Sequence, residues 1–207
     1  MTVLAAVLAL ACVPGAFAAP FLSRGQLKTA VDNCLDVAPY DGVACCATAD
    51  CGPAGTDEMQ TWDVSQVTDM SELFRDKGQF NADISAWNTS QVTDMNNMFY
   101  QATAFYQDIT GWTTTSLTTS TGMFTGATAW LDRVQRGDGT GTDGPISEWV
   151  HKPCLVNERV LSGWCVPCGG GGIRPAGDDP SLGDTMCAFP DTAALKAAVN
   201  ACLSAVP

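Results

Sequence analysis

The sequence is short of charged residues, of histidine and of long hydrophobic runs. Only 15% of its 207 residues are charged, and 10 Lys and Arg residues face 22 Asp and Glu residues, which gives a net charge of −12. This excess of acid excludes a nucleic-acid partner, because too few cations are present to neutralise phosphates. A single histidine, His151, removes most acid–base and metal chemistry. No apolar run reaches the roughly 20 residues that a membrane-spanning helix needs, so no transmembrane helix is expected in the mature chain.

Cysteine, in contrast, is abundant. The chain has 10 cysteines, which is typical of proteins that fold in an oxidising compartment. The amino terminus agrees, because the apolar residues 3–13 are followed by Pro14-Gly15 and by the small-residue sequence Ala16-Phe17-Ala18. This arrangement predicts a signal peptide over residues 1–18. We therefore expect a secreted or cell-surface protein.

Three repeats of 25 residues occupy the middle of the chain. They begin at Trp62, Trp87 and Trp112, and a phenylalanine follows each tryptophan at the twelfth position: Phe74, Phe99 and Phe124. In the first repeat, apolar residues have helical spacing over residues 67–74 and alternate with polar ones, as in a strand, over residues 80–85. The pattern predicts an α/β repeat solenoid of the leucine-rich-repeat type, with short parallel strands and one continuous core.

The first two repeats also share a motif. Trp-Asp-Val-Ser-Gln-Val-Thr-Asp-Met at 62–70 and Trp-Asn-Thr-Ser-Gln-Val-Thr-Asp-Met at 87–95 resemble BspA-like leucine-rich-repeat surface proteins. The same repeat is known from mycoplasma surface lipoproteins and from unicellular eukaryotes. The resemblance covers residues 57–137, and the third repeat keeps only the skeleton of the motif, as terminal repeats do. It implies a surface-displayed binding or adhesion scaffold without known catalysis.

Cysteine-containing segments flank the repeats. The expected order after the signal peptide is a helical cysteine-containing cap at 19–55, the solenoid at 56–137, a Gly-rich linker at 138–150 and a cysteine-rich module at 151–188. The module resembles small extracellular modules of ephrin-receptor and TNF-receptor style. Residues 189–207 are predicted to start a second, truncated unit, because residues 195–203 repeat residues 27–35 with six of nine positions identical.

The cysteines of one complete unit are even in number, which predicts that they pair in disulfides. They are Cys34, Cys45, Cys46, Cys51, Cys154, Cys165, Cys168 and Cys187. Adjacent Cys45 and Cys46 are not expected to bond each other, because the backbone geometry opposes it. Cys165-Val-Pro-Cys168 is interpreted as structural, since a zinc ribbon needs a second such pair. No cofactor and no metal centre are predicted.

Three surface features are candidate interaction sites. If Ile84 points inward, one outward column holds Glu58, Asp83 and Asp108, with Arg133 at its end and Tyr106 nearby. Crowded carboxylates repel, so this column predicts a raised carboxylate pKa and weak binding of Ca²⁺ or a basic group; the alternative is a solvated acidic face. Asn88-Thr89-Ser90 is a candidate N-glycosylation site. Arg136-Gly137-Asp138 spells an integrin-type tripeptide, which is short enough to occur by chance.

Together these features predict a non-catalytic extracellular or cell-surface scaffold that binds a protein or a glycan. No nucleophile–base–acid group can be assembled around His151, which is expected at the surface of the cysteine-rich module, so no enzyme activity is predicted. Two alternatives stay open. One is a structural spacer of a cell wall or extracellular matrix, and the other is a secreted carbohydrate-active enzyme that uses an unidentified pair among the 22 acids.

Overall fold

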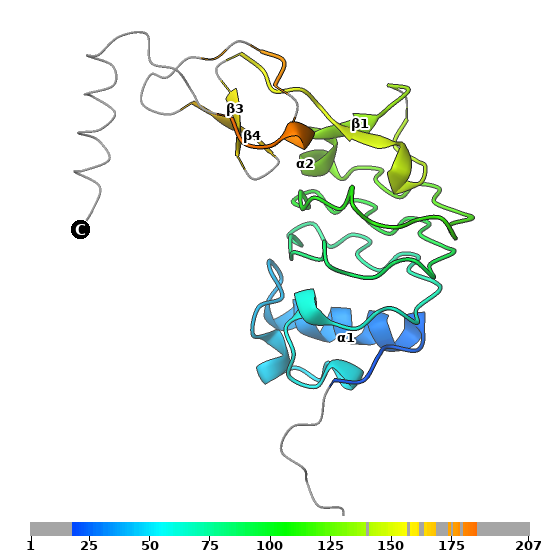
Figure 1. Ribbon diagram of the computed structural model, residues 1–207. Helices are drawn as coiled ribbons and strands as arrows, with labels where there is room; N and C mark the ends of the chain where they lie inside the picture. Colours follow the sequence, from blue (N-terminus) through cyan, green and yellow to red (C-terminus); the bar gives the residue numbers. More distant parts are fainter. Residues whose placement is uncertain are drawn as a thin grey trace, which may run out of the picture.

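The computed structural model describes residues 18–139, 141–156, 158–161, 164–168, 174, 176–178 and 180–185. Within them, stacked turns run from an amino-terminal helical cap to a small cysteine-rich module (Figure 1). No helix in this part of the chain is long and apolar enough to cross a membrane. The predicted signal peptide, apart from Ala18, and the predicted second unit from residue 189 onward lie outside the described residues.

The amino-terminal cap is built on one amphipathic helix. Helix α1 (Arg24–Val37) begins after Ser23, whose hydroxyl accepts the backbone N–H of Gln26 and so satisfies one free donor at the helix end. Its apolar face is buried, and the preceding Phe21 lies against Trp62, with ring centroids 5.3 Å apart. Three short 3₁₀ helices follow: η1 (Cys45–Ala47), η2 (Gly52–Ala54) and η3 (Met59–Thr61). The cap thus covers the apolar end of the first repeat.

Backbone hydrogen bonds join each repeat to the next. We call the three repeats that begin at Trp62, Trp87 and Trp112 rungs, and together the repeat stack. Every second N–H group from Met70 to Asp76 donates to a carbonyl of the second rung, at 2.8 to 2.9 Å. The N–H groups from Met95 to Gln101 donate to the third rung in the same way, also at 2.8 to 2.9 Å. These bonds satisfy backbone groups that would otherwise be buried without partners.

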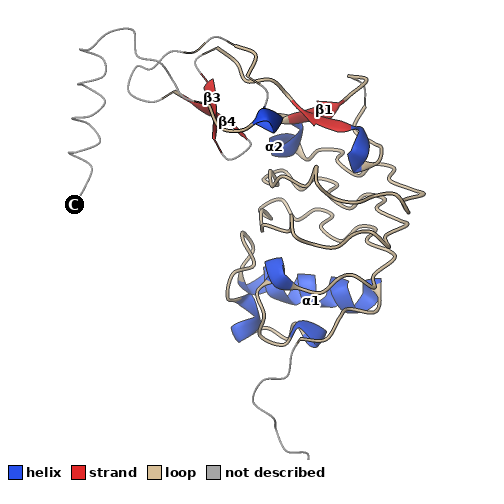
Figure 2. Ribbon diagram, in the orientation of Figure 1, coloured by secondary structure: helices blue, strands red, loops and turns tan. Residues whose placement is uncertain are grey.

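Both local assignments made for the repeats differ from the structure. Residues 67–74 are not a helix, because the N–H groups of Met70, Glu72 and Phe74 bond the next rung instead of a carbonyl four residues earlier. Residues 80–85 are not a strand, although Phe80, Ala82 and Ile84 are buried in the predicted alternation. Parallel pairing among the described rungs consists of single-residue bridges from Asp69 to Asp94 to Thr119, and the first two rungs are drawn as loops (Figure 2). Apolar spacing shows which side chains face the core, and a turn can meet that requirement as well as a helix.

Left-handed backbone conformations recur at two positions of every rung. The residues are Glu72, Asn97 and Gly122 at the first position and Asp76, Gln101 and Gly126 at the second, with φ between 53° and 77°. An L-residue in this conformation costs about 1–2 kcal/mol, because its Cβ approaches the backbone. The inter-rung hydrogen bonds at both positions therefore hold four non-glycine residues in a conformation that favours glycine.

This recurrence predicts opposite effects of two substitutions. Gln101→Gly should raise the free energy of unfolding by about 0.5–1 kcal/mol, because it relieves left-handed strain while adding entropy to the unfolded chain. Gly126→Ala should lower it by about 1–2 kcal/mol, because alanine is disfavoured at the left-handed φ of this position. Urea unfolding of both variants measures these shifts. Gln101→Ala is the control; if it stabilises as much as Gln101→Gly, backbone strain is not the cause.

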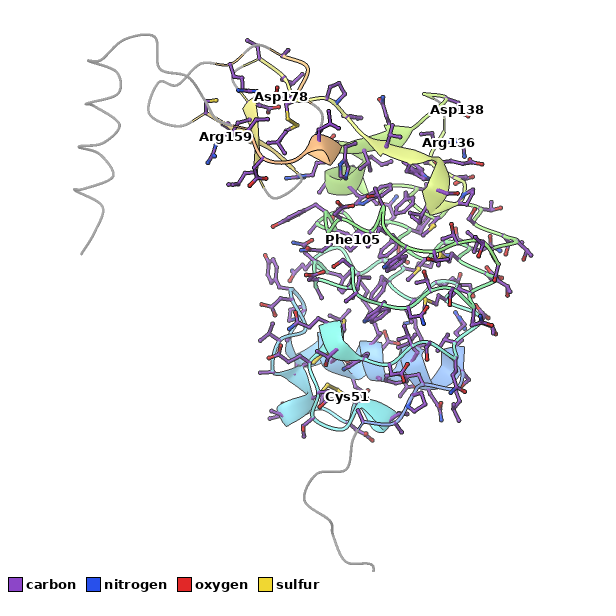
Figure 3. All side chains as sticks on the ribbon, viewed as in Figure 1. Cys51, Phe105, Arg136, Asp138, Arg159 and Asp178 are labelled. Atoms are coloured by element: carbon purple, nitrogen blue, oxygen red, sulfur yellow. A yellow bond between two sulfur atoms is a disulfide. The ribbon has the colours of Figure 1, made fainter. Side chains whose placement is uncertain are left out.

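Stacked aromatic rings form the core of the repeat stack. Phe74, Phe99 and Phe124 stack across the rungs, with centroids 5.4 and 5.5 Å apart. Within each rung the same residue contacts a second aromatic ring: Phe80, Phe105 or Trp130. All six side chains are fully buried, and Figure 3 shows Phe105 inside the stack. Aromatic residues of both neighbouring rungs therefore contact Phe99.

Residues 138–150, predicted to be a linker, close the end of the repeat stack. Helix α2 (Thr128–Leu131) leads into strand β1 (Val134–Arg136), which pairs antiparallel with β2 (Trp149–His151) after the 3₁₀ helix η4 (Ile146–Glu148). Trp149 is only 4% exposed and lies 5.1 Å from the Phe124 ring. The loop also supplies the Thr142 carbonyl to the Phe124 N–H. Without this segment the last rung would expose the rings of Phe124 and Trp130 and an unpaired Phe124 N–H, which explains why the segment packs there.

The cysteine-rich module is small and hydrogen-bonded across two strands. Strand β3 (Glu158–Leu161) pairs antiparallel with β4 (Trp164–Pro167), and the 3₁₀ helix η5 (Pro180–Leu182) follows. In the described residues the disulfides join Cys34 to Cys45, Cys46 to Cys51 and Cys154 to Cys165, and Cys168 is also disulfide-bonded. The expected disulfide pairing is confirmed for these seven cysteines, and Cys45 and Cys46 do not bond each other. Cys187 lies outside the described residues.

Candidate functional site

The acidic residues of the predicted outward column are held by local hydrogen bonds. The carboxylate of Asp83 accepts the N–H and the hydroxyl of Ser85 at 3.0 and 2.7 Å. Asp108 accepts the same two groups of Thr110 at 3.0 and 2.6 Å. The Glu58 carboxylate accepts the amide of Gln60 at 2.8 Å. Each carboxylate therefore has protein partners that stabilise its turn.

Asp108 also faces the only histidine of the chain. His151 Nε2 lies 3.2 Å from Asp108 Oδ2, and the imidazole side chain is only 7% exposed. Burial raises the pKa of Asp108, but hydrogen bonds from His151 and Thr110 lower it more, to about 2. The raised pKa predicted for crowded carboxylates is therefore wrong at Asp108, because hydrogen bonds from His151 and Thr110 favour its charged form. The surface position predicted for His151 is also wrong, because strand β2 places its imidazole ring against Asp108 of the second rung.

The lowered pKa of Asp108 predicts acid sensitivity. Its stabilising contribution is present above the unfolded pKa of 3.8 and is lost as pH falls towards about 2, because the unfolded carboxyl binds its proton first. Asp108→Asn should therefore lower the melting temperature at neutral pH and flatten its decline between pH 4 and pH 2, within the window set by these two values. Asp83→Asn is the matched control, since Asp83 accepts the same kinds of hydrogen bonds from Ser85. Equal acid profiles for wild type and Asp108→Asn would contradict this assignment.

Tyr106 is held between two rungs on the same outer face. Its backbone N–H donates to Asn81 Oδ1 at 2.9 Å, which ties it to the preceding rung. The Arg133 guanidinium lies 4.6 Å from the centre of the exposed Tyr106 ring. Arg133 Nη1 also donates to the Ala129 carbonyl at 2.8 Å, so backbone contacts position both residues. The structure thus fixes a cation against an aromatic ring at the protein surface.

A cleft of about 450 Å³ opens beside Arg133, between the end of the repeat stack and the cysteine-rich module. Its lining comprises Asp132, Arg133, Lys152, Pro153, Leu155, Glu158, Cys165 and Pro180. Four of these residues carry charge, two of each sign, and Leu155 is 67% exposed. In Figure 1 the orange 3₁₀ helix η5 lies next to helix α2, and the cleft is on this side of the molecule. A volume of this size is in the usual range of ligand-binding clefts.

The two short motifs have different environments. Asn88 is exposed, and its Oδ1 accepts the Ser90 N–H at 3.2 Å, so the glycosylation candidate itself is accessible. Arg136, in contrast, forms ion pairs with Asp138 at 3.1 Å and Glu148 at 2.6 Å. Figure 3 shows Arg136 and Asp138 together at the end of the hairpin. The arginine of the integrin-type tripeptide is thus engaged by two carboxylates of its own chain.

Two groups of cysteine and acidic side chains resemble metal ligands in their spacing. Cys34, Cys45 and Cys46 form one group, and Cys154, Glu158 and Cys165 form the other. The sulfur atoms of both groups belong to disulfides, which offer no thiolate to a metal. These clusters are therefore structural.

The repeat register predicts the outer face but not the cleft. Lys152, Leu155 and Glu158 follow β2 in the chain, whereas Asp132 and Arg133 follow helix α2. No motif or periodicity connects these segments, and only the fold brings them together. The one available signal was Arg133 itself, which the repeat register placed at the end of the outward column.

Comparison with known proteins gives one match. No curated protein and no solved structure matches the chain. A family described as "Mycoplasma protein of unknown function, DUF285" matches residues 48–138, which hold all three rungs. This part of the chain is therefore similar to a mycoplasma protein family, in agreement with the resemblance to mycoplasma surface repeat proteins.

Proposed function

We propose that this protein is a non-catalytic extracellular or cell-surface scaffold, an LRR-like repeat solenoid with disulfide-rich flanks that binds a protein or glycan partner. The observation that carries the proposal is the outer surface formed by Tyr106, Arg133 and the adjoining cleft. Tyrosine and arginine are enriched among the residues that dominate binding energy at interfaces. Here both side chains are exposed in part and already oriented, which lowers the entropy lost on binding.

The surrounding structure supports a rigid display of this surface. Inter-rung hydrogen bonds hold Tyr106, and the His151–Asp108 contact connects strand β2 to the same rung. The disulfide between Cys154 and Cys165 constrains the module on the other side of the cleft. A partner would therefore meet a preformed surface assembled from two parts of the chain.

A binding screen with matched variants tests the proposal. Wild-type mature protein is applied to arrays of defined glycans and of purified extracellular proteins, alongside Tyr106→Ala and Tyr100→Ala. Tyr100 is the control because Arg75 lies 4.8 Å from its ring, in the same kind of pair at another point of the rung. We expect a saturable signal that Tyr106→Ala removes and Tyr100→Ala retains, with melting curves confirming that both variants fold.

Three outcomes would contradict the proposal. Absence of saturable binding would favour the structural spacer. Equal binding by the two variants would exclude the Tyr106 surface. Turnover of a glycan on the array would favour the carbohydrate-active enzyme.

A further inference from the structure

We propose that the cleft beside Arg133 binds an extended peptide segment in which an apolar side chain lies between an acidic and a basic one. This inference rests on the proposed function and names the class of ligand. It is drawn from the charges, the hydrogen bonds and the exposed apolar surface of the cleft.

The ammonium group of Lys152 lines the cleft without a carboxylate partner among the described residues. Its ammonium donates one hydrogen bond, to the Leu131 carbonyl at 2.6 Å, and a lysine has three N–H donors. Six other cations pair with carboxylates of the chain: Arg24, Lys28, Arg75, Lys77, Arg136 and Arg174. Among the described residues, Lys152 has no carboxylate partner, although acids outnumber bases more than twofold. The fold thus leaves a positioned ammonium available to an acidic group of a ligand.

Arg133 also lines the cleft, and its backbone lies next to that of Lys152. The backbone N–H of Lys152 donates to the Arg133 carbonyl at 2.8 Å, so the two cationic residues are fixed side by side. Arg133 also contacts Tyr106, which connects the cleft with the outer face of the repeat stack. An acidic side chain in the cleft would therefore lie in a lining that contains both cationic residues.

Two carboxylates line the same cleft. Glu158 Oε2 accepts the Leu155 N–H at 2.8 Å, and Asp132 is exposed. A polyanion such as a sulfated glycan would face both carboxylates and a net charge of −12. An uncharged sugar would leave Lys152, Glu158 and Asp132 without a charged partner among the described residues. A ligand that carries both an acidic and a basic group can pair with the cations and the carboxylates of the lining. Its low net charge also avoids repulsion by the acidic protein.

An apolar surface lies among these charges. Leu155 is 67% exposed, and it lines the cleft together with Pro153 and Pro180. Covering an exposed leucine with an apolar side chain is favourable, because both surfaces leave water. Opposite charges around an apolar contact are what a peptide segment provides, with successive side chains reaching different parts of the cleft.

Fluorescence polarisation of short labelled peptides tests this inference on the full mature chain. A peptide with a Glu-Leu-Lys core should bind, and replacing its leucine by serine should weaken binding about tenfold. Leu155→Ser should weaken binding by a similar factor. Val156→Ser is the matched control, because Val156 is the next residue and 64% exposed but does not line the cleft.

Exchanging the charge of residue 152 and of the peptide gives a second, more specific test. Lys152→Glu should lose affinity for the Glu-Leu-Lys peptide and regain it for a Lys-Leu-Lys peptide, whereas wild type should show the reverse preference. Arg159→Glu is the control, since Arg159 lies in strand β3 of the module and not in the cleft lining (Figure 3). Melting curves establish that each variant is folded.

The results separate this inference from the proposed function. Failure of the Glu-Leu-Lys peptide to bind, or equal effects of Leu155→Ser and Val156→Ser, would overturn the inference. Binding of a sulfated oligosaccharide that depends on Lys152, without peptide binding, would overturn it as well and assign a polyanion. A surface partner that needs Tyr106 but neither Lys152 nor Leu155 would overturn the inference and leave the proposed function standing.

Discussion

Phe99→Ala should lower the free energy of unfolding by about 3–5 kcal/mol, a large share of the stability of a domain of this size. Phe99 is fully buried and stacks on Phe74 and Phe124 in the two neighbouring rungs. It also contacts Phe105 within its own rung, with centroids 4.2 Å apart. Its removal would leave a cavity in the middle of the stack, where rungs on both sides prevent collapse.

Chemical denaturation followed by tryptophan fluorescence measures this loss. Phe99→Leu is the control, because it keeps most of the apolar volume and should cost less than the alanine variant. An alanine variant with the unfolding midpoint of wild type would contradict the aromatic core. Equal losses for both variants would show that ring stacking, and not buried volume, carries the effect.

Trp149→Ala should produce a loss of similar size, about 3–5 kcal/mol. Trp149 packs on Phe124 and Trp130 at the end of the repeat stack, with centroids 5.1 and 4.8 Å away. The substitution should also increase hydrogen exchange at the Phe124 N–H, whose acceptor is the Thr142 carbonyl in the covering loop. A flexible linker at 138–150 would predict neither effect.

The control for this prediction is Val150→Ala. Val150 is the next residue of strand β2 and is exposed, so its truncation should change stability by less than about 0.5 kcal/mol. If Trp149→Ala and Val150→Ala behave alike, the segment does not cover the last rung. Exchange measured at the Met70 N–H, in the first rung, shows whether the loosening stays at the end of the stack.

Much of the core follows from the sequence alone. The 25-residue period and the phase of its apolar residues placed Phe74, Phe99 and Phe124 inward, and all three are buried. Burial is predictable in this way because the side chains that face a core recur with the period of the chain, whatever the backbone between them does. The abundance of cysteine also predicted disulfides, because chains rich in cysteine commonly fold in oxidising compartments.

The direction of the backbone hydrogen bonds was decided by the tertiary structure. Residues 67–74 have the apolar spacing of a helix, but the N–H groups of Met70, Glu72 and Phe74 find acceptors in the next rung. That choice depends on a neighbour a full repeat away and on left-handed residues such as Glu72 and Asp76. No local pattern encodes it, because both backbone paths bury the same side chains.

The candidate site depends on tertiary structure still more. The sequence by itself predicted an outward surface with Asp108, Tyr106 and Arg133, but His151, the partner of Asp108, comes from strand β2, which follows the third rung. The closure by Trp149 and the position of Lys152 in the cleft also require the chain to turn back on the last rung. Composition made residues 138–150 resemble a linker, because glycine is common both in flexible segments and in tight turns. The segment forms ordered turns and not a flexible linker because the aromatic end of the stack must be covered from water.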